Sequence, residues 1–216
     1  MLISVGGHKG ILNEMKFEGL YSTLEKNKYY IFSHKDILSF YPREKRNSLK
    51  KMISRWSKKG VISPLKRGLY ELTYPKDFVI PDMYIANKLY NPSYVSLETA
   101  LSNYSIIPEV SMAVTSITTK PTRKFKNKHG LFIYRTIKPH IFTGYYVERQ
   151  GIFEILVAEP EKALVDFLYF KTYRNKKFSP RDERFDKDVI ARLNRKKINK
   201  YAKLYNMSLK KFYAEL

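Results

Sequence analysis

Residues 43–59 constrain the fold most strongly, because they describe an amphipathic helix with a defined beginning and end. Apolar side chains recur there at helical spacing, at Leu49, Met52, Ile53 and Trp56. Pro42 stands where it can occupy the first helical position, since a missing N–H costs nothing there. Gly60 follows as a C-cap. We therefore predict a helix over 43–59 that packs through one stripe against a core.

The opposite face of this helix is basic and polar. At about 100° per residue, it carries Asn47, Lys51, Ser54 and Lys58, with Arg43, Lys50 and Arg55 at its flanks. Arginine reads guanine with two hydrogen bonds, asparagine reads adenine, and lysine pairs with phosphate. All seven residues are therefore candidates for contact with the major groove of DNA.

The neighbouring segments complete a recognisable order of elements. An amphipathic first helix is predicted from Phe17 to Leu24, and Ser33 with Asp36 forms a capping box before a short helix ending near Phe40. After Gly60, residues 61–63 and 69–72 predict a hairpin, with Lys66 and Arg67 at the tip of its turn, Pro64 to Gly68. This order predicts a winged helix-turn-helix whose wing contacts the DNA backbone.

The rest of the chain mixes helices and strands. Short helices are expected over 82–90 and 96–104, separated by residues 91–93, and strands over 112–118, 131–137, 145–148 and 153–157. We expect a basic loop from Lys120 to His129, a buried helix opened by Pro160, and one long helix over 186–205. The predicted fold class is α+β, with a winged helix-turn-helix domain over 1–75 and a mixed α/β domain with a basic helical tail over 76–216.

A formal net charge of +21 indicates a polyanionic partner, although A/T-rich codons also favour lysine. Residues 1–75 carry 15 basic and 6 acidic side chains, and residues 171–216 carry 15 and 5. Between them, residues 151–170 carry 1 basic and 4 acidic side chains. Uniform codon drift does not predict two separated basic regions. The second region presents Arg192, Arg195 and Lys196 as a further candidate nucleic-acid surface.

Several other classes of protein are disfavoured by the sequence. There is no cysteine, hence no disulfide framework or thiolate metal site. His8, His34, His129 and His140 have no metal-ligand spacing, so we expect neither metal nor cofactor. The apolar runs fall short of the ~20 residues that span a bilayer, and no signal peptide precedes them. We expect a cytoplasmic protein with no membrane association.

Three acidic residues and a lysine that lie close together in the sequence are candidates for catalysis: Glu154, Glu159, Glu161 and Lys162. Metal-dependent nucleases place a carboxylate and a lysine on one strand, whereas Pro160 forbids a central strand here. Acidic residues in a first helical turn instead favour the helix dipole. We interpret this group as helix capping and expect no enzymatic activity.

Three segments carry a family resemblance: NPSYVSLETAL, ending at Leu101; GLFIY, from Gly130 to Tyr134; and AEPEKALVDFL, from Ala158 to Leu168. Together with the hairpin GVISPLKRGLYEL they resemble the AbiEi antitoxin family of type IV toxin–antitoxin systems. The match spans roughly residues 45–170 in the family's order.

The resemblance implies a winged-helix domain followed by an α/β antitoxin domain. It further implies a repressor that binds inverted repeats of double-stranded DNA in its own promoter. It also implies antagonism of a nucleotidyltransferase-like toxin without a stable complex between the two proteins. The residues leave two alternatives open: a stand-alone regulator without a toxin, and an RNA-binding or nuclease protein that uses the basic region from Lys171 to Lys211.

Overall fold

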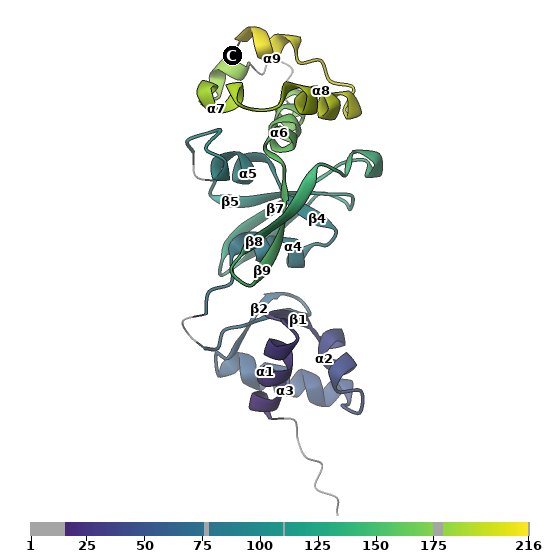
Figure 1. Cartoon of the computed structure of the whole chain (residues 1–216). Helices are drawn as coiled ribbons and strands as arrows, with labels where there is room; N and C mark the ends of the chain where they lie inside the picture. Colours follow the sequence, from purple (N-terminus) through teal and green to yellow (C-terminus); the bar gives the residue numbers. More distant parts are fainter. Residues whose placement is uncertain (1–15, 76–77, 110, 175–178, 216) are drawn as a thin grey trace, which may run out of the picture.

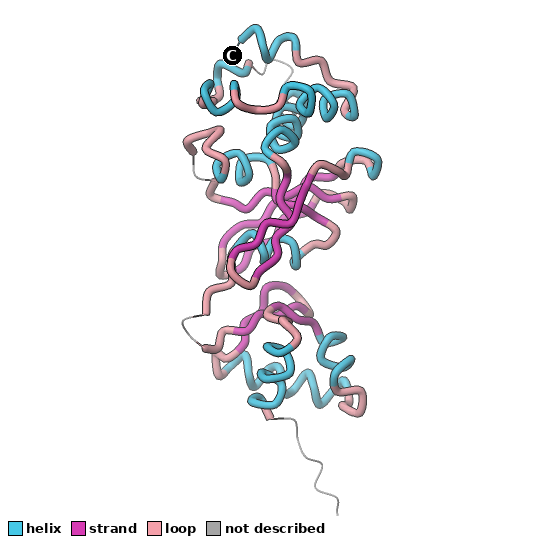
Figure 2. Tube along the Cα trace, viewed as in Figure 1, coloured by secondary structure: helices cyan, strands magenta, loops and turns pink. Residues whose placement is uncertain are grey.

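The computed structural model describes residues 16–75, 78–109, 111–174 and 179–215, so His8 lies outside the described residues. The fold is α+β, as predicted, and consists of a small first unit, a six-stranded sheet with its helices, and a helical end (Figure 1). Figure 2 shows the two sheets as separate bodies of strands.

The first unit packs three helices against a small antiparallel sheet. Its elements are α1 (Phe17–Lys26), β1 (Ile31–Ser33), α2 (His34–Phe40), α3 (Arg46–Lys58), β2 (Ile62–Lys66) and β3 (Leu69–Leu72). The strand order is β1-β3-β2, and the sheet lies on the side of the unit that faces the second sheet (Figure 1). Leu20, Phe32 and Met52 are fully buried in a core of their own.

The capping box of α2 is confirmed. The Ser33 N–H donates to Asp36 Oδ2 at 2.6 Å, and the Asp36 N–H donates to Ser33 Oγ at 3.4 Å. The predicted beginning of the next helix is wrong. The Glu44 N–H donates to the Tyr41 carbonyl and closes a turn, so α3 begins at Arg46 and Arg43 precedes it.

The hairpin turn is tighter than predicted. β2 continues through Pro64 to Lys66, so only Arg67 and Gly68 lie between the strands. Gly68 adopts a φ of +80°, which favours glycine and permits so short a connection. Lys66 is therefore a strand residue and not a tip residue, and Arg67 alone remains at the tip.

The second unit is built on a mixed sheet of order β6-β7-β5-β4-β9-β8. Its helices are α4 (Asp82–Leu89), α5 (Leu97–Asn103) and α6 (Pro160–Arg174), and its strands are β4 (Ser93–Val95), β5 (Ala113–Thr118), β6 (Arg123–Asn127), β7 (Gly130–Thr136), β8 (Tyr145–Gln150) and β9 (Phe153–Ala158). Short 3₁₀ turns are η1 (Pro139–Ile141) and η2 (Pro180–Asp182), and the helical end comprises α7 (Lys187–Ala191), α8 (Arg195–Leu204) and α9 (Lys210–Glu215).

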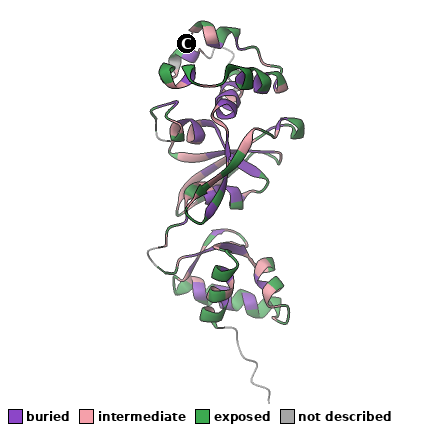
Figure 3. Cartoon of the chain, viewed as in Figure 1, coloured by how far each residue is buried: buried purple, intermediate pink, exposed green. Residues whose placement is uncertain are grey.

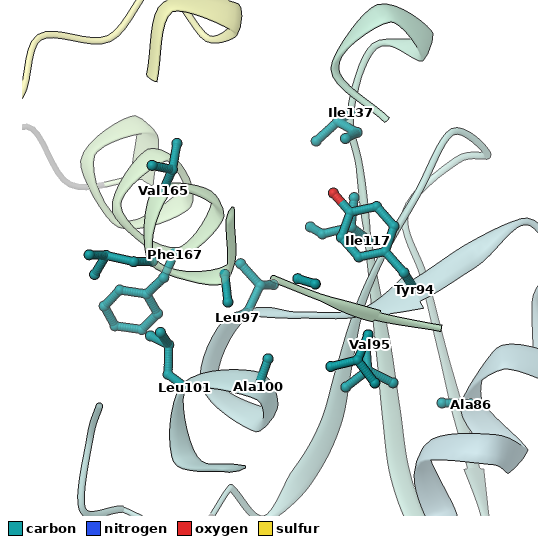
Figure 4. Packing of buried hydrophobic residues seen from close by; sticks show 14 of the residues in the cluster. Ala86, Tyr94, Val95, Leu97, Ala100, Leu101, Ile117, Ile137, Val165 and Phe167 are labelled. Atoms are coloured by element: carbon teal, nitrogen blue, oxygen red, sulfur yellow. The ribbon is translucent and has the colours of Figure 1, made fainter. Parts of the chain in front are cut away.

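Helices cover both faces of this sheet. α4 lies on the face toward the first unit, and α5 and α6 lie on the other (Figure 1). Leu101 of α5 lies beside Phe167 of α6 (Figure 4), and both side chains are buried. Burial continues along α6 toward the helical end, whose outer surface is exposed (Figure 3). α6 therefore joins the sheet to α7–α9.

Two strands of the six-stranded sheet were not predicted. β4 follows the Asn91-Pro92 pair and lies in the middle of the sheet, between β5 and β9. β6 occupies most of the expected basic loop and pairs with β7 from Arg123↔Tyr134 to Asn127↔Gly130. β6 is an edge strand, and charged side chains are common at edges because they discourage pairing with another chain.

The expected long helix over 186–205 is divided in two. Asn194 accepts hydrogen bonds from the N–H groups of Lys196 and Lys197 through its side chain, which begins a new helix at Arg195. Arg192 ends α7. The proposed surface residues Arg192 and Arg195 therefore belong to the two sides of this break.

Candidate nucleic-acid interface

A basic hollow lies between α3 and the β2–β3 hairpin. It encloses about 720 Å³.

 It is lined by the α3 residues Arg46, Lys50, Ile53, Ser54, Ser57 and Lys58, the hairpin residues Arg67, Gly68 and Tyr70, and His34 of α2. No acidic side chain is among these residues. The hollow therefore has the charge that suits an anionic ligand.

The core stripe of α3 explains why these side chains face outward. Leu49, Met52, Ile53 and Trp56 are buried, as predicted, and fix the rotation of the helix. Arg46, Lys50 and Ser54 follow one another at intervals of four, which places them on one line along the helix surface. Together with Lys58, they give α3 a basic edge beside the hairpin.

The predicted site residues divide into two groups around this helix. Lys50, Ser54, Lys58 and Arg67 line the hollow. Asn47, Lys51 and Arg55 are exposed but do not line it, and Arg43 is exposed in the turn before α3. At about 100° per residue, Lys51 and Arg55 lie farther around the helix from the hairpin than Lys50 does.

Lys66 lies at the junction between the two units and outside the hollow. Its ammonium donates to the Leu89 carbonyl at the end of α4 and lies 5.2 Å from the centre of the Phe125 ring in β6. Burial, and then the positive charges of Lys120 and Arg123, lower the pKa of Lys66. The sequence suggested an exposed tip, whereas the longer β2 directs this side chain to the second unit.

Six residues that line the hollow were not among the predicted site residues: His34, Arg46, Ile53, Ser57, Gly68 and Tyr70. Burial lowers the pKa of His34, and the nearby charges of Lys50 and Arg46 lower it further. Its ring lies edge-on to Tyr70, with centroids 5.4 Å apart. Arg46 could have been found from its spacing of four before Lys50, but His34 and Tyr70 come from other elements and carry no local signal.

A second basic surface adjoins the hairpin on β6. Lys124 and Lys126 are exposed on this edge strand, and Arg123 lies over the rings of Tyr90 and Phe125, at 5.8 and 6.0 Å. The amide of Asn127 donates to the Leu65 carbonyl of β2 at 3.3 Å. β6 is therefore held next to the hairpin, and the positive charge of the hairpin continues onto the second unit.

The second unit also encloses a polar cluster around Lys162 and Asp166, which pair one helical turn apart on α6 and are fully buried. The Lys162 ammonium donates to the Tyr94 hydroxyl at 2.9 Å, and Asp166 accepts from Ser96 Oγ at 2.8 Å. Tyr205, the residue that follows α8, also donates to Asp166. The cluster joins β4, α6 and α8, so two of the three segments that carry the family resemblance meet here.

Burial shifts the proton equilibria of this cluster. It lowers the pKa of Lys162, an effect opposed by the charge and hydrogen bond of Asp166. Burial and the Asp166 charge raise the pKa of Tyr205 far above its ordinary range. The hydroxyls of Tyr94 and Tyr205 are therefore held neutral beside Lys162 and Asp166, enclosed away from solvent.

The acidic group considered for catalysis does not form one accessible site with Lys162. Glu154 pairs with Arg149 at 3.1 Å, and its side chain is 61% exposed. Glu159 pairs with Lys197 at 2.9 Å, and Glu161 accepts from the Asn194 N–H at 3.0 Å. The interpretation as helix capping is thus incomplete, because Glu159 and Glu161 also attach the helical end to α6.

The second proposed surface lies on the helical end. Arg192, Arg195 and Lys196 are exposed, and the Arg195 guanidinium lies 5.3 Å from the centre of the Tyr213 ring in α9. Within the described residues, no group of three or more His, Asp or Glu side chains is arranged to hold a metal ion.

Comparisons with known proteins add no assignment: no family model and no curated protein matches the chain. Among the described residues, no helix is both long and apolar enough to cross a membrane.

Proposed function

We propose that the first unit is a winged helix-turn-helix that binds double-stranded DNA, with α3 as the recognition helix and β2–β3 as the wing. The observation that carries this proposal is the basic hollow, in which Arg46, Lys50 and Lys58 of α3 face Arg67 of the hairpin. The major groove is about 12 Å wide and admits one α-helix. A helix in the groove would leave the hairpin beside the adjacent phosphates.

Charge composition supports the same surface. α3 contains five basic and no acidic residues. Lys124 and Lys126 on β6 extend the positive charge beyond the wing. Phosphate contacts from such side chains fix a protein on the duplex, while base contacts from the helix supply sequence specificity.

We further propose that the chain is a non-enzymatic antitoxin that represses its own operon and antagonises a nucleotidyltransferase-like toxin. The three segments that resemble the AbiEi family support this part, and two of them build the Lys162–Asp166 cluster. Inverted repeats in the promoter would require two copies of the chain on DNA. The exposed Arg192, Arg195 and Lys196 would compete for an RNA that the toxin modifies.

The test of DNA binding is a titration of the full chain with a duplex that covers the promoter of its own operon. Arg46→Glu with Lys50→Glu should abolish binding, because the variant places two negative charges in the hollow. The matched control is Lys196→Glu with Lys200→Glu, which makes the same charge change on α8. If about six phosphates are contacted, log K should fall with log salt at a slope of roughly −5.

Two results would contradict the proposal. One is an affinity that does not change with salt. The other is equal loss of binding in the α3 variant and the α8 variant, since net charge and not the hollow would then control binding. The antitoxin part is tested separately, by co-expression with a nucleotidyltransferase encoded beside this gene: no rescue of growth would refute it.

A further inference from the structure

A buried carboxylate lies where the two units meet. Glu71 belongs to β3, the central strand of the small sheet, and only 1% of the residue is exposed. The side chains of Lys128 and His129, both in the second unit, approach it. Lys128 Nζ lies 2.6 Å from Glu71 Oε1, and His129 Nε2 lies 2.7 Å from Glu71 Oε2. Both residues lie in the turn between β6 and β7.

This turn is itself held in place from two sides. His129 Nδ1 lies 3.2 Å from Asp82 Oδ1 at the start of α4, and the His129 N–H donates to Asn127 Oδ1 at 2.9 Å. The Asn127 amide donates in turn to the Leu65 carbonyl of β2. The turn therefore contacts both strands of the hairpin while it remains attached to the second unit.

Because Glu71 is buried, loss of its partners would cost more free energy than loss of the partners of an exposed glutamate. A buried carboxylate without partners is costly, and removing one partner of a buried ion pair is strongly destabilising. Two hydrogen bonds also cross the junction, from Lys66 to the Leu89 carbonyl and from Asn127 to the Leu65 carbonyl. The other contacts are aromatic, with Tyr30 4.8 Å from Phe78 and 5.3 Å from Phe153, measured between ring centres. Such apolar contacts favour association but are non-directional. The contacts of Glu71, together with these two hydrogen bonds, therefore favour one orientation of the units.

The same strand connects this contact to the hollow. Tyr70 precedes Glu71 in β3, and successive side chains of a strand point to opposite faces. Tyr70 lines the hollow together with Arg67 and Gly68, while Glu71 faces the second unit. The contacts of Lys128 and His129 with Glu71 therefore hold β3, the strand whose Tyr70 lines the hollow.

We propose that Glu71 is a positioning residue, through which Lys128 and His129 of the second unit hold the hairpin in the orientation used to contact DNA. The consequence for DNA binding rests on the proposed function. The fixed orientation of the two units does not, and it can be measured without DNA. Because the chain contains no cysteine, pairs of spin labels can be introduced without side reactions.

The experiment measures the distance between labels at Glu18→Cys in α1 and Asn199→Cys in α8, both exposed positions, in the full chain. The unaltered junction should give one narrow distance distribution. Glu71→Gln should broaden it, because the amide removes the charge that attracts Lys128 and His129. Lys128→Gln, at a side chain that is 47% exposed, should broaden it less and carries little risk of misfolding.

The matched control is Glu109→Gln, which removes the ion pair with Arg184 far from the junction and should leave the distribution narrow. The proposal would be overturned if both Glu71→Gln and Lys128→Gln gave a distance distribution as narrow as that of the parent chain. DNA affinity of Glu71→Gln should fall about fivefold or more, as is typical of coupling between sites. Unchanged affinity despite a broadened distribution would overturn the positioning role.

Failure of the proposed function gives a different pattern. Arg46→Glu with Lys50→Glu should abolish DNA binding and keep the distance distribution narrow, since neither residue touches the junction. If the parent chain binds no DNA, the proposed function is wrong, while the distance measurement still decides whether Glu71 orients the units.

Discussion

α3 and α8 have nearly the same composition and different surroundings. Each contains five basic and no acidic residues. α3 places Arg46, Lys50 and Lys58 along a hollow whose other wall is a hairpin. On α8, Lys197 pairs with Glu159 and Arg195 packs over Tyr213. The two helices therefore differ in their neighbours and not in their net charge: α3 lies beside a hairpin, and α8 contacts acidic and aromatic side chains.

The largest effect is expected on stability, from loss of the ion pair between Lys162 and Asp166 that is buried in the second unit. Lys162→Met should leave Asp166 buried without its cation and lower the free energy of unfolding by about 3–5 kcal/mol. Lys197→Met, which removes the exposed pair with Glu159, should have a much smaller effect on the same measurement. Chemical denaturation of both variants checks the comparison. Equal destabilisation would contradict a special role for the enclosed pair.

The next effect separates the two basic helices by function. Replacing Arg192, Arg195 and Lys196 with glutamine should abolish protection from the toxin, because their charges would no longer compete for RNA. Repression through α3 should be unchanged. Growth during toxin expression and a promoter reporter measure the two activities in the same cells. Intact protection, or a parallel loss of repression, would count against this division of roles.

A smaller effect is expected from a single cation of the wing. Arg67→Gln should remove one phosphate contact and reduce the salt slope by about 0.9. Lys66→Gln should change the slope less, because Lys66 is held by the Leu89 carbonyl and Phe125. Binding titrations across a range of salt concentrations check both. A larger change in the salt slope for Lys66→Gln than for Arg67→Gln would contradict the assignment of Arg67 as the residue of the wing that contacts DNA.

The smallest effect concerns pH. The pKa of His34 is lowered by burial, Lys50 and Arg46, and phosphate in the hollow would oppose the effect of those charges. DNA binding would then take up a proton, so affinity should rise as pH falls below about 6.5. Acid has the opposite effect on folding stability in the absence of DNA. The unfolded chain binds more protons than the folded chain in this pH range, so the free energy of unfolding decreases as pH is lowered. A His34→Gln variant with the same pH profile of affinity as the parent would contradict this.

Local patterns predicted the elements that depend on neighbouring residues. The core stripe of α3 and the capping box of Ser33 and Asp36 follow from spacing alone, and the structure confirms both. Local patterns did not predict elements whose formation depends on partners distant in the sequence. β4 and β6 are short or highly charged, and they become strands by pairing with β5, β7 and β9.

The candidate site shows the same limit. Lys50, Ser54, Lys58 and Arg67 were predicted from helix periodicity and the hairpin, and they line one hollow. Lys66 differs because β2 extends beyond its predicted end, which brings the side chain to α4 and β6. The contact of Glu71 with Lys128 and His129 joins residues more than fifty positions apart, and no local pattern indicates it.

The most direct test of the central claim is hydrogen–deuterium exchange of the full chain with and without the promoter duplex. The account predicts slower exchange in α3 and the β2–β3 hairpin when DNA binds, and little change in α8. Slower exchange in α8 without any change in α3 would contradict it, since the equally basic helix without a facing hairpin would then be the one that contacts DNA.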